Sequence, residues 1–141
     1  MPAEKGSILT AAADITVKKY DGTTDITWSV LKGAGGDSDP AVWRSNTAAG
    51  YVGQRPTFQL SSRANQAGTV RRLDFRGEFP SVYTNADTSQ TQVAGTVVLT
   101  GSIAVPGSIS ITDVDEACAQ LMHILATSAI VNAMIAGYAP T

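Results

Sequence analysis

Hydrophobic and polar positions alternate with a period of two in three successive segments of the chain, 56–64, 69–80 and 93–107. In the second segment, one side carries Leu73, Phe75 and Phe79, and the other carries Arg72, Asp74, Arg76 and Glu78. Such alternation is typical of antiparallel strands with one covered face and one polar face. We expect the second strand to end at Pro80, because proline cannot donate a hydrogen bond to a sheet.

Weaker alternation precedes these segments. Two apolar-rich runs between Ser7 and Val30 flank "YDGTTD" at 20–25, and Asp-Gly is a strong signal for a hairpin turn. The Gly- and Asp-rich stretch 32–40 predicts a loop, and Val42–Ser45 predicts a short strand. The polar, aperiodic stretch 81–92 predicts a second loop.

The period changes to that of a helix after residue 111. Thr112 or Asp113 is the expected N-cap, and Gly137 is the expected stop. Residues 129–136 are apolar on nearly all sides, which indicates burial on all sides. The same tail from a second copy is the simplest cover, in an isologous dimer. The expected dimer-interface residues are Val114, Cys118, Leu121, Met122, Leu125, Ile130, Val131, Met134 and Ile135.

These elements define an α+β fold in a single domain, 1–141. The domain comprises an N-terminal β-hairpin (1–31), a main antiparallel sheet (42–106) of about five strands, and two C-terminal α-helices (112–137).

The net charge of the chain and the charge of one local segment lead to different expectations. The net charge of −2 argues against a generally basic nucleic-acid binder. Between residues 55 and 76, however, five arginines face only one acid, Asp74, whereas residues 77–141 contain no Lys or Arg. An ordinary solvated face is the alternative explanation for this window. The five arginines are Arg55, Arg63, Arg71, Arg72 and Arg76.

Candidate chemistry is sparse. The single cysteine, Cys118, and the single histidine, His123, exclude an intramolecular disulfide and a His- or Cys-rich metal cluster. "GAGGD" at 33–37 lacks the Gly-Lys-Ser/Thr ending of a phosphate loop. Asp74 and Glu78 alternate with arginines, which favours mutual neutralisation over acid–base catalysis. We expect no enzyme activity, cofactor, metal, signal peptide or membrane span.

The polar sides of the three alternating segments are the candidate RNA-binding surface, because hydroxyls, amides and arginines bind phosphates and bases. A solvated sheet face is again the alternative. The candidate residues are Thr57, Gln59, Ser61, Arg63, Arg72, Asp74, Arg76, Glu78, Thr96, Val98, Thr100 and Ser102.

The order of these parts resembles the coat proteins of single-stranded RNA bacteriophages, the levivirus family. The resemblance covers about residues 7–138 and rests on an ordered set of stretches: "VWRSN", "PTFQLSSRANQAGTVRRLDFRGEFP", "VAGTVVLTGSIAVPG", "TDVDEACAQLM" and "SAIVNAMIAGY". It implies an intertwined homodimer with crossing helices, an icosahedral shell, and a polar sheet face that meets genomic RNA inside the virion. Assembly in the bacterial host cytoplasm follows, and loop 81–92 would gather around the symmetry axes of the shell.

One position departs from the family pattern. Val98 stands where well-known members place a tyrosine that stacks on an RNA base, so recognition of a translational-operator hairpin in that manner is in doubt. Two alternatives to a coat protein remain open at this point. One is a small dimeric RNA-binding regulatory module that forms no shell. The other, weaker one is an enzyme that uses Asp74 and Glu78, which would need a pocket that a flat sheet seldom offers.

Overall fold

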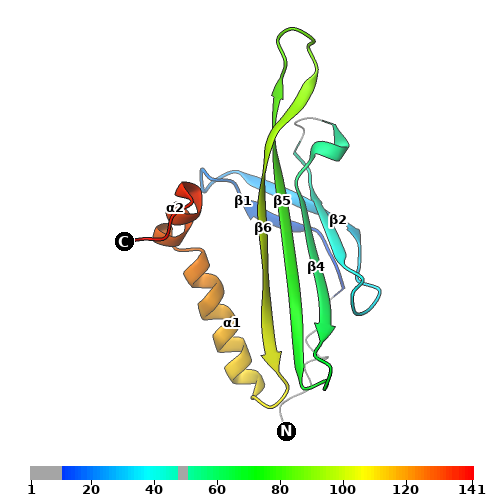
Figure 1. Ribbon diagram of the computed structural model, residues 1–141, viewed down its shortest axis with the longest axis vertical. Helices are drawn as coiled ribbons and strands as arrows, with labels where there is room; N and C mark the ends of the chain where they lie inside the picture. Colours follow the sequence, from blue (N-terminus) through cyan, green and yellow to red (C-terminus); the bar gives the residue numbers. More distant parts are fainter. Residues whose placement is uncertain (1–10, 48–50) are drawn as a thin grey trace. The chain divides into compact units, whose positions relative to one another are not determined.

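A computed structural model describes residues 11–47 and 51–141. They form two compact units, a sheet unit (11–105) and a helical unit (106–141). Six strands pair in chain order in one antiparallel sheet, and two helices follow (Figure 1). The strands are β1 (Ile15–Lys18), β2 (Asp25–Lys32), β3 (Ala41–Ser45), β4 (Thr57–Ala64), β5 (Val70–Thr84) and β6 (Thr91–Pro106). The helices are α1 (Ile111–Leu125) and α2 (Ser128–Ala136), and a short 3-10 turn, η2 (Val52–Gln54), precedes β4.

The predicted α+β fold is confirmed, but one six-stranded sheet replaces the expected hairpin and main sheet of about five strands. The N-terminal hairpin is not a separate element, because its strands are β1 and β2 of the same sheet. At its turn, Asp21 accepts hydrogen bonds from the backbone N–H groups of Thr23 and Thr24. A hydrogen bond from the Thr24 hydroxyl, and then these two backbone bonds, lower the pKa of Asp21 to about 2. The part of the predicted hairpin before residue 11 lies outside the described residues.

The prediction that Pro80 ends its strand is wrong. β5 continues through Pro80 to Thr84. β4 pairs with β5 only as far as Thr57 opposite Glu78, so Pro80 lies beyond the end of that pairing. A strand tolerates proline where no ladder partner needs its missing N–H.

The predicted loop 81–92 is correspondingly shorter, because β6 already begins at Thr91. The turn 85–90 joins the ends of β5 and β6 (Figure 1). Asn85 organises it: its side-chain oxygen accepts from the backbone N–H groups of Asp87 and Thr88, and its own N–H donates to Gln90 O at 2.8 Å. Long-range hydrogen bonding therefore extends the sheet into a stretch whose polar sequence shows no alternation.

The helices begin and end for local reasons. Ser110, not the expected Thr112 or Asp113, is the N-cap of α1, and its hydroxyl accepts from Asp113 N at 3.2 Å. Gly137 ends α2 with φ of 80°, a left-handed conformation that favours glycine, as predicted. No residue of either helix is buried. Neither described helix is long and apolar enough alone to cross a membrane; the two satisfy those criteria only when joined across their 55° bend.

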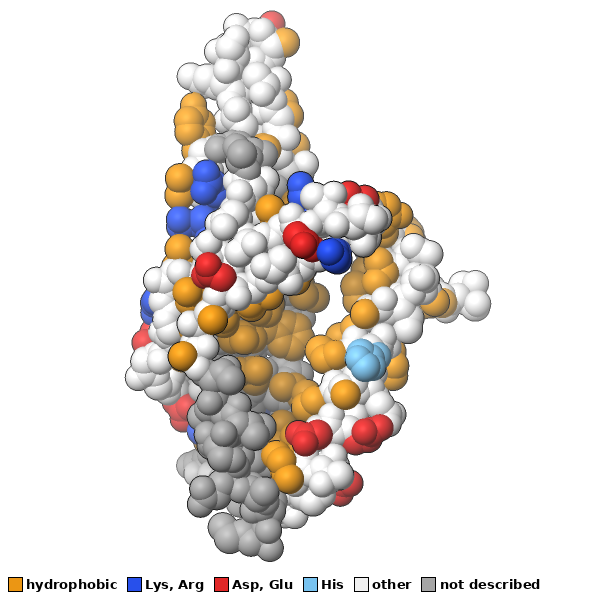
Figure 2. Space-filling model, turned by 180° about the vertical axis from the view of Figure 1, so that it is seen from behind, with side chains coloured by type: hydrophobic (Ala, Val, Ile, Leu, Met, Phe, Trp, Pro, Cys, Tyr) orange, Lys and Arg blue, Asp and Glu red, His pale blue; other side chains and the backbone are white. Residues whose placement is uncertain are grey.

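The core of the sheet unit is small. Ala41 and Trp43 are the buried apolar residues among those described, together with the fully buried Pro56. The Trp43 ring packs on Phe58 with centroids 6.0 Å apart, and its indole N–H donates to Ala13 O at 2.8 Å. A hollow of about 260 Å³ beside this pair is lined by Ile15, Val17, Trp28, Trp43 and Phe58. Figure 2 shows hydrophobic side chains gathered on this part of the sheet.

Candidate nucleic-acid interface

The pairing of β4 with β5 determines which side chains share a face. Thr57 lies opposite Glu78, Gln59 opposite Arg76, Ser61 opposite Asp74, and Arg63 opposite Arg72. Phe58 and Leu60 alternate with these residues and pair with Gly77 and Phe75, so they point to the opposite surface, which we call the apolar face. All eight candidates from these two strands therefore lie on one surface, which we call the polar face.

The candidates on β6 join the same surface. A Cβ atom at Gly101 would lie 2.6 Å from Cζ of Phe75, and one at Gly77 would lie 3.7 Å from Cβ of Leu99. Leu99 and Gly101 therefore belong to the apolar face with Phe75. Alternation then places the remaining four candidates of this strand on the polar face, and all four are exposed: Thr96, Val98, Thr100 and Ser102.

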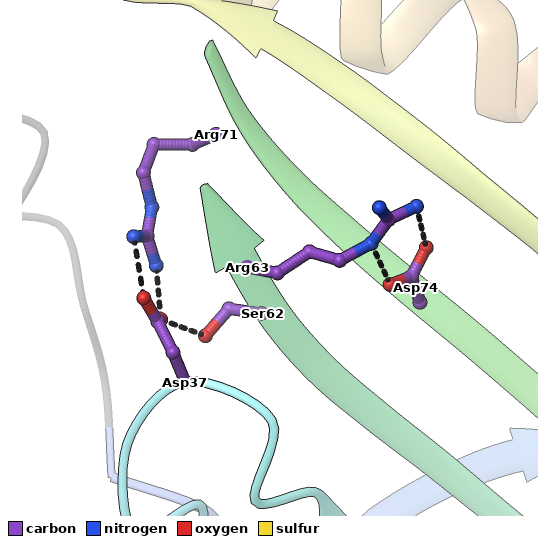
Figure 3. A network of polar contacts seen from close by, with 5 residues as sticks. All are labelled: Asp37, Ser62, Arg63, Arg71 and Asp74. Atoms are coloured by element: carbon purple, nitrogen blue, oxygen red, sulfur yellow. Dashed lines mark hydrogen bonds and ion pairs between the residues drawn. The ribbon is translucent and has the colours of Figure 1, made fainter. Parts of the chain in front are cut away.

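Two ion pairs bridge the polar face. Nε of Arg63 donates to Asp74 Oδ2 at 2.7 Å across the β4–β5 pair (Figure 3). Nε of Arg76 donates to Glu78 Oε1 at 2.8 Å along β5. The hydrogen bond from Arg63, and then the charges of Arg63 and Arg72, hold the pKa of Asp74 below its ordinary value. The expected mutual neutralisation thus occurs, but it leaves Arg72 without an ion pair among the described residues.

Arg71 belongs to a different cluster. Alternation along β5 turns it away from the polar face, and its guanidinium donates to both carboxylate oxygens of Asp37, at 2.6 and 3.0 Å. Ser62 also donates to this carboxylate, at 3.2 Å (Figure 3). The hydrogen bond from Arg71 is the main reason that the pKa of Asp37 is lowered. The arginines of the 55–76 window therefore do not form one positive patch, because Arg71 lies on the opposite face and is paired with Asp37.

Two arginines that sequence reasoning did not assign also belong here. The pairing of Arg44 with Thr57 and with Ser29 places Arg44 on the polar face. The strand that carries it is only five residues long, too short for its alternation to be recognised. Arg55 was counted in the charge window, but it follows η2 and precedes Pro56. No alternating pattern of apolar and polar residues therefore predicted which face of the sheet its side chain joins.

The polar face offers binding groups rather than reactive ones. Asp74 and Glu78 are each held by an arginine, so neither carboxylate is free to act as a base. The described residues contain no group of three or more His, Cys, Asp or Glu side chains placed to hold a metal ion. Hydroxyls, amides and guanidinium groups remain, and these bind phosphates and base edges.

The predicted dimer-interface residues lie on α1 and α2 and are accessible in the single chain. Leu121 is 50% exposed, Met134 52% and Ile135 68%. Met122 and Leu125 are likewise exposed, whereas Val114, Cys118, Ile130 and Val131 are half-buried. A group of apolar side chains this exposed to solvent is typical of a surface that binds another protein surface.

Comparison with known proteins identifies the fold. No protein-family model and no curated protein matches the chain. Among solved structures, the arrangement is that of RNA-bacteriophage coat proteins, as the sequence resemblance implied.

Three of these structures illustrate the likeness. The virus-like particle of bacteriophage NT-214 matches with a TM-score of 0.75 and 15% identity, over 92% of this chain and 98% of that one. The coat protein of bacteriophage EMS014 gives a TM-score of 0.73 and 20% identity, over 94% and 100% of the two chains. The capsid protein of bacteriophage GA gives 0.69 and 19%, over 89% and 95%.

Proposed function

We propose that this chain is the major coat protein of a single-stranded RNA bacteriophage. Two copies form an intertwined homodimer, dimers assemble into an icosahedral shell, and the polar face contacts the enclosed genomic RNA. The protein is then a structural component of the virion, assembled in the host cytoplasm, and has no catalytic role. If the same face also represses translation through an operator hairpin, it must do so without a stacking tyrosine, because Val98 stands at that position. The observation that carries the proposal is the likeness to coat proteins over nearly the full length of both chains.

Exposed apolar surface supports the homodimer. On the apolar face of the sheet, Leu73, Phe79, Val97 and Leu99 are between 37% and 71% exposed. A sheet with one apolar face is stable only when another layer covers that face. A second copy offers equally accessible apolar helices, and an isologous arrangement satisfies both chains at once.

The make-up of the polar face supports RNA as the content of the shell. Its hydroxyl and amide side chains can bond bases and sugars, and its arginines can pair with phosphates. Arg72 retains an uncompensated charge, because Arg63 already holds Asp74. The whole protein carries a net charge of −2, so attraction to RNA requires a local excess of positive charge, which the arginines of this face offer.

Expression of the chain alone tests the proposal. Purified protein should form closed particles in electron micrographs, and these should release nuclease-sensitive RNA when disrupted. A protein that stays monomeric at all concentrations would contradict both the shell and the dimer.

The turn 85–90 separates a shell protein from a dimeric RNA-binding module. Replacing 85–90 with a two-residue turn should abolish particles or change their size, while the dimer persists in sedimentation analysis. Particles unchanged in size would show that this turn has no part in the shell. Dimers that bind RNA but form no particles even with the native turn would favour the regulatory module.

The direction of the polar face can be tested through RNA retention. Replacing Arg72 and Arg76 together with Ala should lower the RNA content and make it less sensitive to salt, because each lost phosphate contact lowers the salt slope by about 0.7. Arg71→Ala is the matched control, since Arg71 points to the opposite face. Equal losses in both variants would contradict the inward assignment.

A further inference from the structure

Two arginines lie side by side where β3 meets the start of β4. Arg44 pairs with Thr57, and the N–H of Ser45 donates to Pro56 O at 2.9 Å, which continues this pairing by one residue. The backbone of Arg55 is extended, with φ of −77° and ψ of 146°. Alternation therefore places Arg55 on the polar face with Thr57. Arg44 and Arg55 are diagonal neighbours there, about 7–8 Å apart at the backbone and within reach of long side chains.

Both arginines share an uncommon feature. The Nε atoms of Arg44 and Arg55 are shielded from solvent and have no hydrogen-bond partner among the described residues. Neither arginine belongs to the ion pairs found in that part of the chain. A shielded Nε cannot itself meet a ligand, but two neighbouring guanidinium charges without an ion pair among the described residues repel each other. One ligand with several anionic oxygens, bound through the terminal Nη groups, would relieve this repulsion.

The acids of this region are engaged elsewhere. Thr57 pairs with Arg44 on one side and with Glu78 on the other, so Glu78 lies two strands from Arg44 in the same row. The Glu78 carboxylate, however, accepts a hydrogen bond from Arg76. Asn46, two residues after Arg44, adds hydrogen-bond donors to this part of the chain. Asn46 accepts from Ser29 Oγ at 2.7 Å through its carbonyl oxygen, which leaves its amide N–H groups to donate to a ligand.

We propose that Arg44 and Arg55 form a binding site for a backbone phosphate of single-stranded RNA. The proposal rests on the coat-protein function above and deepens it, because it assigns a phosphate contact to a part of the polar face that the twelve sequence candidates do not include. Two guanidinium groups offer planar, paired donors that match phosphate oxygens, which a lysine pair would not. The site recognises the phosphate and not the base, so it positions RNA without selecting sequence.

The test uses the full-length protein with Arg44→Gln and Arg55→Gln combined, and Arg71→Gln as the matched control on the opposite face. Binding of a fluorescent uridine 12-mer is measured between 50 and 300 mM NaCl. Loss of two contacts to a single strand should reduce the magnitude of the log–log salt slope by about 1.4. The control should keep the wild-type slope. An unchanged slope in the double variant would overturn the site.

Two further arms complete the test. The conservative Arg44→Lys, Arg55→Lys variant keeps the charge but not the paired donors, so it should keep the slope yet bind more weakly; binding equal to wild type would overturn the guanidinium assignment. Inorganic phosphate should compete with the 12-mer for wild type more than for the double variant. If phosphate stabilises wild type but does not compete with RNA, the site takes free phosphate and the RNA assignment fails. Wild-type protein that binds no RNA would instead overturn the proposed function.

Discussion

Gly101 is the position where the packing of β6 on β5 can be tested most directly. An alanine Cβ there would lie 2.6 Å from Cζ and 2.9 Å from Cε2 of Phe75. Carbon atoms prefer separations of about 3.5–4.0 Å, so the ring must move by about 1 Å. Overpacking of this kind costs about 1–3 kcal/mol. Replacing a strand glycine with alanine otherwise stabilises by about 0.5–1 kcal/mol, so Gly101→Ala should be a net loss.

Gly95 provides the matched control on the same strand and the same face, because a Cβ there meets nothing within 4 Å. Gly95→Ala should gain the usual increment, so the two variants should differ by about 1–3 kcal/mol in free energy of unfolding. Chemical denaturation at equal protein concentration measures this difference. Equal stabilities, or a more stable Gly101→Ala, would show that β6 does not face Phe75 through Gly101. The assignment of Thr96, Val98, Thr100 and Ser102 to the polar face would then fail.

Three further predictions concern the RNA surface, a loop contact and the dimer. Val98→Tyr should strengthen hairpin RNA binding in a gel-shift assay by up to about 1–3 kcal/mol through base stacking, whereas Val97→Tyr on the apolar face should not. The Asp37 pKa is lowered from 3.8, so its contact with Arg71 stabilises the fold above that pH and is lost as pH falls through the folded value. The stability gap between wild type and Asp37→Asn should accordingly be present at pH 6 and close below pH 3.8; a constant gap would contradict this. Met134→Asp should leave monomers in sedimentation analysis, because an unpaired charge in an apolar interface is costly, whereas Asn132→Asp should still dimerise.

Sequence periodicity predicted the sheet faces well where strands are long. Leu73 and Phe75 separate from Arg72 and Asp74 because side chains must alternate in any strand, whatever its partners. Gly137 was likewise predictable, since a left-handed residue after a helix favours glycine for local steric reasons.

Features set by neighbours distant in sequence were not predictable in this way. Whether Pro80 ends β5 depends on where β4 stops, and the pairing of Arg71 depends on a loop more than thirty residues earlier. Ser110 was missed because several polar residues precede α1 and only backbone geometry selects the cap. Arg44 was missed because its position is defined by the pairing of β3 with β4, not by a pattern within β3.

The small interior of the sheet unit has a consequence for how the protein comes to be folded. Ala41, Trp43 and Pro56 are the buried apolar residues of the described chain, so one copy alone removes little apolar surface from water. In the proposed homodimer, the second copy would supply much of the hydrophobic driving force, so folding would be a bimolecular event. The melting temperature should rise with concentration, and newly made chains should be most vulnerable to proteases while they are still rare in the cell.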